Sequence, residues 1–467
     1  MTFTKSLIAS SIVACCTIGA FSAAAKEAPP VGATPKAFAV PATDTMTLDN
    51  GLTVTFIPYG STPKATLRLV TNTGNIDDGN HVWLSDISYE MLRQGTQNRS
   101  AKALAETVAS MGGEINTSVG MDSSFIGMSV LSEFTGDAAT VLADMVLNAT
   151  FADSDIARIK TDRQRELAVD KSSPSSIASE AFYQSVYGNH PYGTLFPTEE
   201  SLAEISADNT KQFIATNVIP NRSHLYVSGV FDKNQVANAV KEAFGSWKKG
   251  AMPERNMVLT QAGPSLTIIE RENAPQSTLR LGLATLSPAH NDYMTLSVMN
   301  TLLGGAFSSR ITSNIREDKG YTYSPNSAVV NRVGTGMWYQ AADVTAESTG
   351  ASLYEIIKEI NLLATEAPSK EELAGIQNYL SGIFVLRNSS RSAIISQLAF
   401  IELHGLDKSY LQDYVKNIYA ITPKDISEVT EKYLDVSKMH LTIVGDTTTV
   451  TPQLKEVKSL APFMWKQ

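Results

Sequence analysis

The sequence predicts an α+β protein made of two tandem homologous halves, each an antiparallel-rich sheet with helices packed on one face. The first observation is an internal repeat, because the segment ATLRLV at residues 65–70 returns as STLRLG at residues 277–282. The second is that each half closes with a similar strand, and the histidines that open these strands, His224 and His440, lie 216 residues apart. The third is that short alternating strands are separated by longer helical patterns. These observations indicate duplication of one unit of roughly 200 residues.

The first 25 residues have the pattern of a secretory signal. Lys5 is their only charge, an apolar stretch covers residues 7–25, and this stretch ends in three alanines. We therefore expect an exported, periplasmic protein with a removable signal at residues 1–25 and a flexible lead-in at residues 26–44. The residues that end at Cys15 resemble a bacterial lipobox, so a lipid anchor through Cys15 is the alternative.

Cysteine usage agrees with this interpretation of the N-terminus. The chain has two cysteines, Cys15 and Cys16, and both lie inside the predicted signal. If the signal is cleaved near its alanines, the mature chain has no disulfide, no thiolate ligand and no thiol nucleophile.

The remaining chain divides at a turn-rich stretch between the two repeats. We expect an N-terminal domain at residues 45–250, a linker at residues 251–264 and a C-terminal domain at residues 265–467. Within the first domain, Ser100 is expected to cap a helix that stops at Gly112. Within the second, a helix is expected to follow Ser369, with acidic residues in its first turn.

Composition excludes some classes of function. Lys and Arg total 38 against 47 Asp and Glu, which gives a formal net charge of −9. A nucleic-acid partner is therefore not expected, since such partners require a basic face. No later run of apolar residues is long enough to span a bilayer, so we expect no transmembrane segment after signal removal.

The most specific motif lies in the second half. The run GGAFSSR at residues 304–310 is followed by IREDKGYTYS at residues 315–324. This order and spacing resemble the second-domain signature of the pitrilysin/insulinase family of zinc peptidases. In the first half, the strand opening at Asn50 and the motif that starts at His190 are also similar to that family.

The resemblance covers nearly the whole mature chain and implies one half of a clamshell chamber. It also implies that a segment of the first half forms an edge strand that binds substrate. The corresponding residues here are Gly113, Glu114, Ile115 and Asn116.

The metal site is where this sequence departs from the family. Active members carry His-x-x-Glu-His, in which the histidines bind zinc and the glutamate is the general base. In the family a Gly-Thr pair follows a few residues after this motif, and here that pair is Gly95-Thr96. Counting back from it places Asp86, Tyr89 and Glu90 at the positions of His, Glu and His. No His-x-x-Glu-His occurs anywhere in the chain. We therefore expect no zinc and no cofactor in this chain, because oxygen ligands replace both imidazoles and a phenol, with its ordinary pKa of about 10, replaces the base.

An altered metal site is the alternative interpretation of the same helix. Asp86 and Glu90 share one helical face, and Glu166 or Asp162 could supply a third carboxylate for a hard cation such as calcium, magnesium or manganese. His81 precedes this helix and is expected to be a loop histidine rather than a ligand.

A second pair of family positions is retained. The resemblance implies that an arginine and a tyrosine of the last domain reach the substrate at the zinc of an opposing domain. These residues are Arg316 and Tyr323, whereas Tyr321 does not have the family spacing. Cationic and phenolic donors of this kind stabilise the oxyanion of an attacked carbonyl.

These features resemble the zinc-less subunit of a heterodimeric zinc peptidase. We expect a homologous zinc-binding peptidase subunit as partner, zinc in that partner, and peptides or small unfolded proteins as substrates. The isolated chain is expected to be inactive. The alternative is a catalytically inert peptide-binding or scaffold protein of the same fold.

Overall fold

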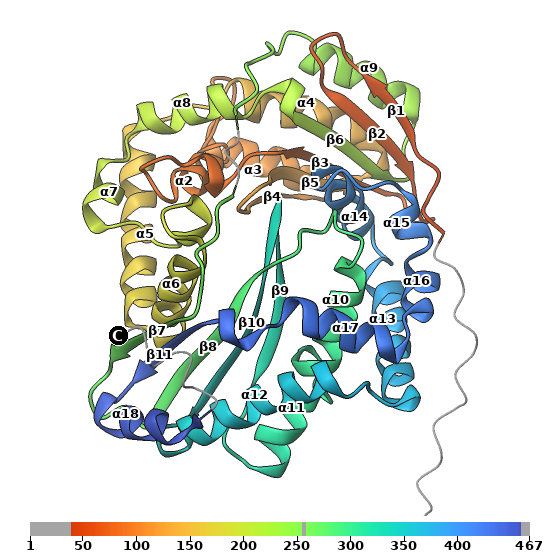
Figure 1. Cartoon of the computed structure of the whole chain (residues 1–467). Coiled ribbons are helices and arrows are strands. Elements are labelled where there is room, and N and C mark those ends of the chain that lie inside the picture. The colour runs from red at the N-terminus through yellow and green to blue at the C-terminus, as the bar shows by residue number, and fades with distance from the viewer. Residues whose placement is uncertain (1–38, 255–257, 459–467) are drawn as a thin grey trace, which may run out of the picture. The chain divides into compact units, whose positions relative to one another are not determined.

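The computed structural model describes residues 39–254 and 258–458 (Figure 1). The predicted signal, Cys15 and the lead-in up to residue 38 lie outside the described residues. Among the described residues, no helix is both long enough and apolar enough to cross a membrane.

The first half contains a six-stranded sheet in the order β1-β2-β6-β3-β5-β4. β2 and β6 are parallel, and the other neighbours are antiparallel. The strands are β1 (Asp44–Thr47), β2 (Thr53–Pro58), β3 (Lys64–Thr71), β4 (Glu114–Val119), β5 (Ser124–Leu131) and β6 (Ser223–Gly229).

The second half repeats this topology in a five-stranded sheet with the order β7-β11-β8-β10-β9. The one parallel pair is again the opening strand with the closing strand. The duplication predicted from the sequence is therefore confirmed by the strand order. The strands are β7 (Ser265–Glu270), β8 (Gln276–Thr285), β9 (Asn326–Arg332), β10 (Thr335–Thr345) and β11 (His440–Gly445).

Helices fill the chain between the strands. Ser100 caps α3 by accepting the Ala103 N–H, as the sequence predicts. The helix expected after Ser369 is α13, and the structure shows that Ser369 caps it by accepting the Glu372 N–H. In the first half the helices are α2 (Leu84–Met91), α3 (Ala101–Ser110), α4 (Thr135–Leu147), α5 (Asp153–Ser172), α6 (Pro174–Tyr187), α7 (Glu199–Glu204), α8 (Ala207–Asn217) and α9 (Lys233–Phe244). In the second half they are α10 (Tyr293–Asn300), α11 (Arg310–Thr312), α12 (Thr349–Thr365), α13 (Lys370–Arg387), α14 (Arg391–Leu403), α15 (Ser409–Gln412), α16 (Tyr414–Ala420), α17 (Pro423–Tyr433) and α18 (Thr447–Glu456).

Each sheet buries one face against helices of its own half. In the first core, strand residues such as Leu67 and Leu225 pack with Ile87 of α2 and Val141 of α4. The second core is built in the same way around the fully buried Trp338 of β10. Burial of this apolar surface is the main driving force for the α+β arrangement.

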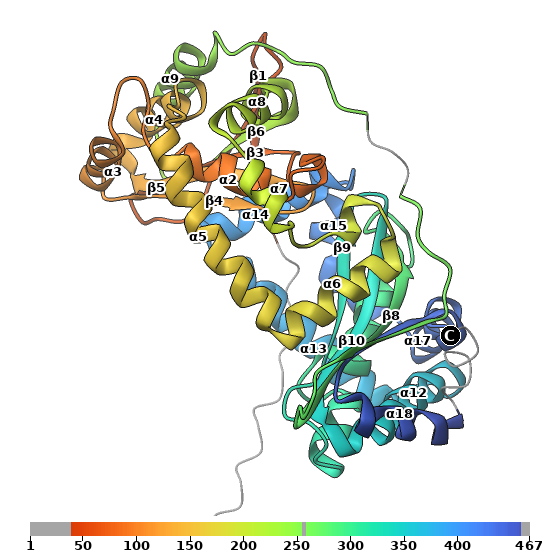
Figure 2. The same cartoon turned by 90° about the vertical axis from the view of Figure 1, so that its left-hand side faces the viewer.

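The opposite face of each sheet is also covered, which the sequence pattern did not predict. Helix α14 of the second half packs on β3 and β6, where Leu398 contacts the cluster around Tyr226 (Figure 1). Helix α6 of the first half packs on β7, β8 and β11, where Phe182 joins Met337 of β10 in one buried cluster (Figure 2). The two halves therefore exchange equivalent helices.

Candidate functional site

Helix α2 carries Asp86, Tyr89 and Glu90, which occupy the positions of the zinc motif, and its start is fixed by a preceding loop. Trp83 stands at the N-cap with a left-handed backbone (φ 72°) and provides no side-chain cap. Asp78 supplies the missing acceptors, taking the N–H groups of Trp83 at 2.9 Å and Ser85 at 2.8 Å. The sequence holds no local cap signal because the acceptor lies outside the helix.

Asp86 faces this loop. Its carboxylate accepts a hydrogen bond of 2.7 Å from the Nδ2 atom of Asn75. Burial raises the pKa of Asp86, and the hydrogen bond from Asn75 and the positive charge of Arg163 partly oppose that rise. His81 lies in the loop before α2, where its carbonyl oxygen accepts the Leu84 N–H.

Tyr89 stands where the general base was expected and lies in the core. Its side chain is 1% exposed and belongs to the main apolar cluster of the first half. Burial raises the pKa of its phenol still further above the ordinary value. A protonated, enclosed phenol has no access to a water molecule and cannot activate one.

Arg163 of α5 lies among the carboxylates that were considered as alternative metal ligands. Its guanidinium is 3.5 Å from Glu90 Oε2 and 2.7 Å from Glu166 Oε2. Asp162 instead pairs with Arg165 at 2.8 Å, so it does not join this group.

The residues present at this site do not fit a bound zinc ion. Across residues 39–254 and 258–458, no three His, Cys, Asp or Glu side chains are placed to hold a metal. The nitrogen ligands that favour zinc are missing here, and a permanent cation lies among the oxygens that remain.

Arg316 and Tyr323 lie together in the second half. Arg316 belongs to a π-helical segment (Ser313–Asp318), and the end of a second π-helical segment (Thr301–Gly305) lines the same hollow. Both side chains line a hollow of about 260 Å³ whose described lining residues come from 304–326. Such π-helical turns are rare and often occur at functional sites.

Two exposed aromatic rings flank the Arg316 guanidinium. Its central carbon is 4.2 Å from the ring centre of Phe307 and 5.3 Å from that of Tyr323. Phe307 is 70% exposed and Tyr323 is 81% exposed. Tyr321 differs, because it packs against the core of the second half.

The two arginines of the motif differ in their ion pairs. No acidic group among the described residues forms an ion pair with Arg316, whereas Arg310 in the same motif forms a double hydrogen bond with Glu372 at 2.7 Å. The Arg316 guanidinium is thus available to a ligand that enters the hollow.

The predicted substrate strand is β4, which lies at the edge of the first sheet. It contains Glu114, Ile115 and Asn116, and among the described strands it pairs only with β5. Gly113 precedes it and approaches the neighbouring strand so closely that a Cβ there would lie 2.3 Å from the Ser129 carbonyl oxygen. Among the strands that the structure describes, none pairs with the other edge of β4.

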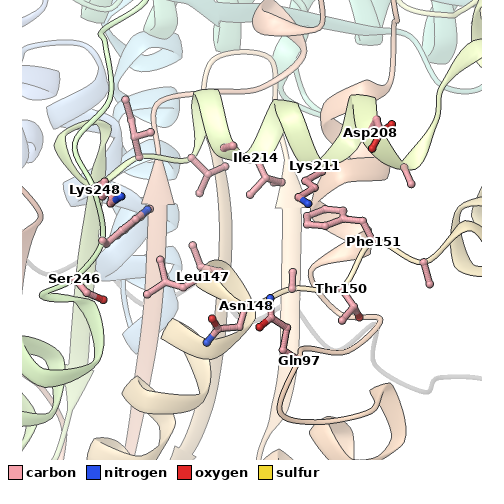
Figure 3. A pocket seen from close by; sticks show the side chains of 18 residues that line it. Gln97, Leu147, Asn148, Thr150, Phe151, Asp208, Lys211, Ile214, Ser246 and Lys248 are labelled. Carbon is pink, nitrogen blue, oxygen red and sulfur yellow. The ribbon is translucent and has the colours of Figure 1, made fainter.

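A larger hollow of about 800 Å³ lies elsewhere in the first half, between the end of α4, helix α8 and the segment after α9 (Figure 3). Its walls include Phe151, Lys211 and Lys248. None of the site residues predicted from the sequence is among its described lining residues.

Sequence reasoning missed two residues of these sites. Arg163 has no local signal that links it to Glu90, because the two lie in different helices. Phe307 belongs to the recognised motif, but only the structure shows its ring against Arg316.

The duplicated sheets and the arginine–tyrosine site define a two-domain chain of the peptidase type. Residues 55–196 match the family model described as Insulinase (Peptidase family M16), and residues 204–380 match the Peptidase M16 inactive domain. The chain belongs to the insulinase family, as the motifs predicted, and it lacks that family's His-x-x-Glu-His motif.

Relatives and solved structures agree with this assignment. The chain is 26% identical over 347 residues to the uncharacterized zinc protease YmxG of Bacillus subtilis. The aligned region covers 72% of this chain and 82% of that protein. It is 25% identical over 363 residues to the uncharacterized zinc protease ML0855 of Mycobacterium leprae, over 74% of this chain and 78% of that protein.

Two solved structures share the fold. A peptidase M16 inactive domain from Pseudomonas fluorescens has a TM-score of 0.80 at 23% identity, over 87% of this chain and 98% of its own. A protease from Helicobacter pylori has a TM-score of 0.81 at 17% identity, over 87% of this chain and 100% of its own.

Proposed function

We propose that this chain is the non-zinc-binding subunit of an exported heterodimeric zinc peptidase. In this proposal a homologous partner holds the zinc, and this chain contributes Arg316 and Tyr323 to the partner's active site. The observation that carries the proposal is a half-buried arginine beside an exposed tyrosine, with no ion pair to that arginine among the described residues, in a chain whose own metal positions do not fit zinc.

The chemistry of the pair suits an attacked peptide carbonyl. The guanidinium presents several N–H donors in a fixed plane, and the phenol presents one O–H donor. Donors that are held in place before the reaction stabilise negative charge as it develops on the oxygen. The exposed ring of Tyr323 and the hollow beside it leave room for a polypeptide substrate.

The test is reconstitution with an exported, similar-sized chain that carries His-x-x-Glu-His. The pair should cleave fluorogenic peptides, a chelator should stop the cleavage, and neither chain alone should be active. Arg316→Ala and Tyr323→Phe should each lower kcat by about 10²–10³-fold, as expected for loss of one oxyanion donor.

Matched controls lie on the exposed face of α13. Arg387→Ala and Tyr379→Phe remove the same functional groups at positions that do not line the hollow. They should leave turnover unchanged. The proposal is wrong if both site variants retain full turnover in a pair that requires this chain.

A second candidate function is peptide binding without cleavage, and the unpaired edge of β4 favours it. A peptide that adds to this edge would use main-chain hydrogen bonds. Replacing alternate amide groups of a bound peptide by esters should then weaken its binding to the isolated chain, whereas ester replacement in the other register should not.

A further inference from the structure

Arg316 is in contact with aromatic rings, whereas Arg310 of the same motif is held by a carboxylate. The double hydrogen bond from Arg310 to Glu372 occupies two N–H groups and places a negative charge beside the guanidinium. Among the described residues no carboxylate forms an ion pair with Arg316. The nearer ring is that of Phe307, whose centre lies 4.2 Å from the central guanidinium carbon, against 5.3 Å for Tyr323. The structure thus gives Arg316 aromatic contacts where Arg310 has an ionic one.

The backbone around Phe307 is fixed, although its ring is exposed. The Ala306 N–H donates to the Thr301 carbonyl oxygen at 3.0 Å, and the Ser309 N–H donates to the Ala306 carbonyl oxygen at 3.0 Å. Ala306 and Ser309 are both buried, on either side of a phenylalanine that is 70% exposed. Because so exposed a ring buries little apolar area, hydrophobic burial does not explain its position. The turn presents the ring to the hollow that Arg316 also lines.

A carboxylate and an aromatic ring hold a guanidinium with different consequences. A carboxylate accepts hydrogen bonds from the N–H groups at the edge of the guanidinium, whereas a ring attracts the cation to its π face without taking up those groups. We infer that Phe307 is a positioning residue, which orders the Arg316 guanidinium while leaving its N–H donors free for the substrate. The role in turnover rests on the proposed function, whereas the ordering of the side chain does not.

The order of the Arg316 side chain is measured in the isolated chain. In protein labelled with nitrogen-15 arginine, the heteronuclear NOE of each side-chain Nε–H reports motion on the ps–ns timescale. The NOE of Arg316 should resemble that of Arg310, which Glu372 holds. In Phe307→Leu it should fall toward that of Arg165, whose side chain is 73% exposed. Phe307→Trp should keep the wild-type value, because tryptophan attracts a cation most strongly.

The effect of this order on the reaction is measured in the reconstituted pair. Phe307→Leu should lower kcat by about 2–5-fold with KM unchanged, as loss of one exposed cation–π contact implies. Phe307→Trp should retain the wild-type kcat. In an Arg316→Ala background Phe307→Leu should have no further effect, because a residue that acts through Arg316 then has nothing to position. Tyr379→Leu removes an exposed ring that does not line the hollow, and it should change neither the NOE nor kcat.

The two measurements separate this inference from the proposed function. The inference is overturned if Arg316 keeps its wild-type NOE in Phe307→Leu. It is also overturned if Phe307→Leu slows the Arg316→Ala pair further, or raises KM by an amount that depends on the side chains of the peptide, since the ring would then contact the substrate directly. Full turnover of Arg316→Ala would contradict the proposed function instead, and the NOE comparison would still decide whether Phe307 orders Arg316.

Discussion

Two tyrosines at family motif positions lie in opposite environments. Tyr89, at the position of the general base, is 1% exposed, whereas Tyr323, beside Arg316, is 81% exposed. A buried phenol contributes apolar packing to the core. An exposed phenol contributes little apolar packing, and the ion pairs of the described residues leave the neighbouring Arg316 unpaired, so the ligand-binding role proposed above is compatible with both observations.

The carboxyl group of Asp78, in the loop before α2, should make the stability of the fold depend on pH. The residue is 4% exposed, and burial raises its pKa to about 7 against the hydrogen bonds from Ser85 and Asn75. Because the folded state then holds a proton that the unfolded chain releases near pH 4, stability falls as pH rises from about 4 to about 7 and levels off above that.

We predict that Asp78→Asn flattens this dependence. Between pH 5 and pH 8 the free energy of unfolding of the wild-type chain should fall by more than that of the variant, by an amount on the order of 1–4 kcal/mol. Urea unfolding across this range measures the two slopes. Parallel slopes would contradict the prediction. The variant should also be less stable at every pH, because asparagine has one acceptor oxygen and either the Trp83 or the Ser85 N–H then loses its partner.

At the scale of elements, the segments that carry the Arg316 site are π-helical, whereas the adjacent α10 and α11 are α-helices. Gly304 lies in the first π-helical segment, and a Cβ there would lie 2.6 Å from both Gln340 Oε1 and Ser327 Oγ. The close approach of this segment to β9 and β10 therefore requires glycine. It also fixes one wall of the hollow that contains Arg316 and Phe307.

In helix α13, unlike at Gly304, replacing glycine by alanine is expected to stabilise the protein. Gly375 and Gly382 lie within the helix, and no heavy atom lies within 4 Å of a Cβ built at either position. Gly375→Ala and Gly382→Ala should each raise the free energy of unfolding by about 0.5–1 kcal/mol, because alanine loses less backbone entropy in a helix.

Gly304→Ala is the contrasting variant and should lower stability. Urea midpoints of the three variants measure both effects. A loss of stability in Gly375→Ala would show that this face of α13 is packed in solution.

At the scale of the whole described chain, the exchange of α6 and α14 couples the two halves. Glu402 of α14 lies 2.6 Å from His224 Nδ1 of β6, and the Tyr226 hydroxyl donates to the same Glu402 oxygen. At the other contact, the Tyr192 hydroxyl donates to Asp122 at 2.6 Å, and the Val333 N–H donates to the second oxygen of Asp122 at 3.2 Å. Each half thus completes the structure of the other.

We predict that the halves unfold as one unit. Phe182 of α6 is fully buried against the second sheet, so Phe182→Ala should cost about 3–5 kcal/mol. Hydrogen exchange should then rise in β3 of the first sheet and in β10 of the second by similar factors.

The exposed Val169 on α5 provides the control, and Val169→Ala should change stability by less than about 0.5 kcal/mol. A rise in exchange confined to one sheet would contradict the prediction and would show that the halves open independently.

The sequence by itself determined the duplication, the cap of α3, the start of α13, the loss of the zinc ligands and the retained spacing of Arg316 and Tyr323. These features are local, since each depends on residue types at short separations or on a repeat that can be aligned by eye. The tertiary structure alone decided that Tyr89 lies in the core, that Phe307 flanks Arg316, that Arg163 joins Glu90 to Glu166, and that α6 and α14 cross between the halves. The physical reason is that these contacts join residues on separate elements, and the packing of those elements, rather than any local pattern, brings such residues within a few ångströms of each other.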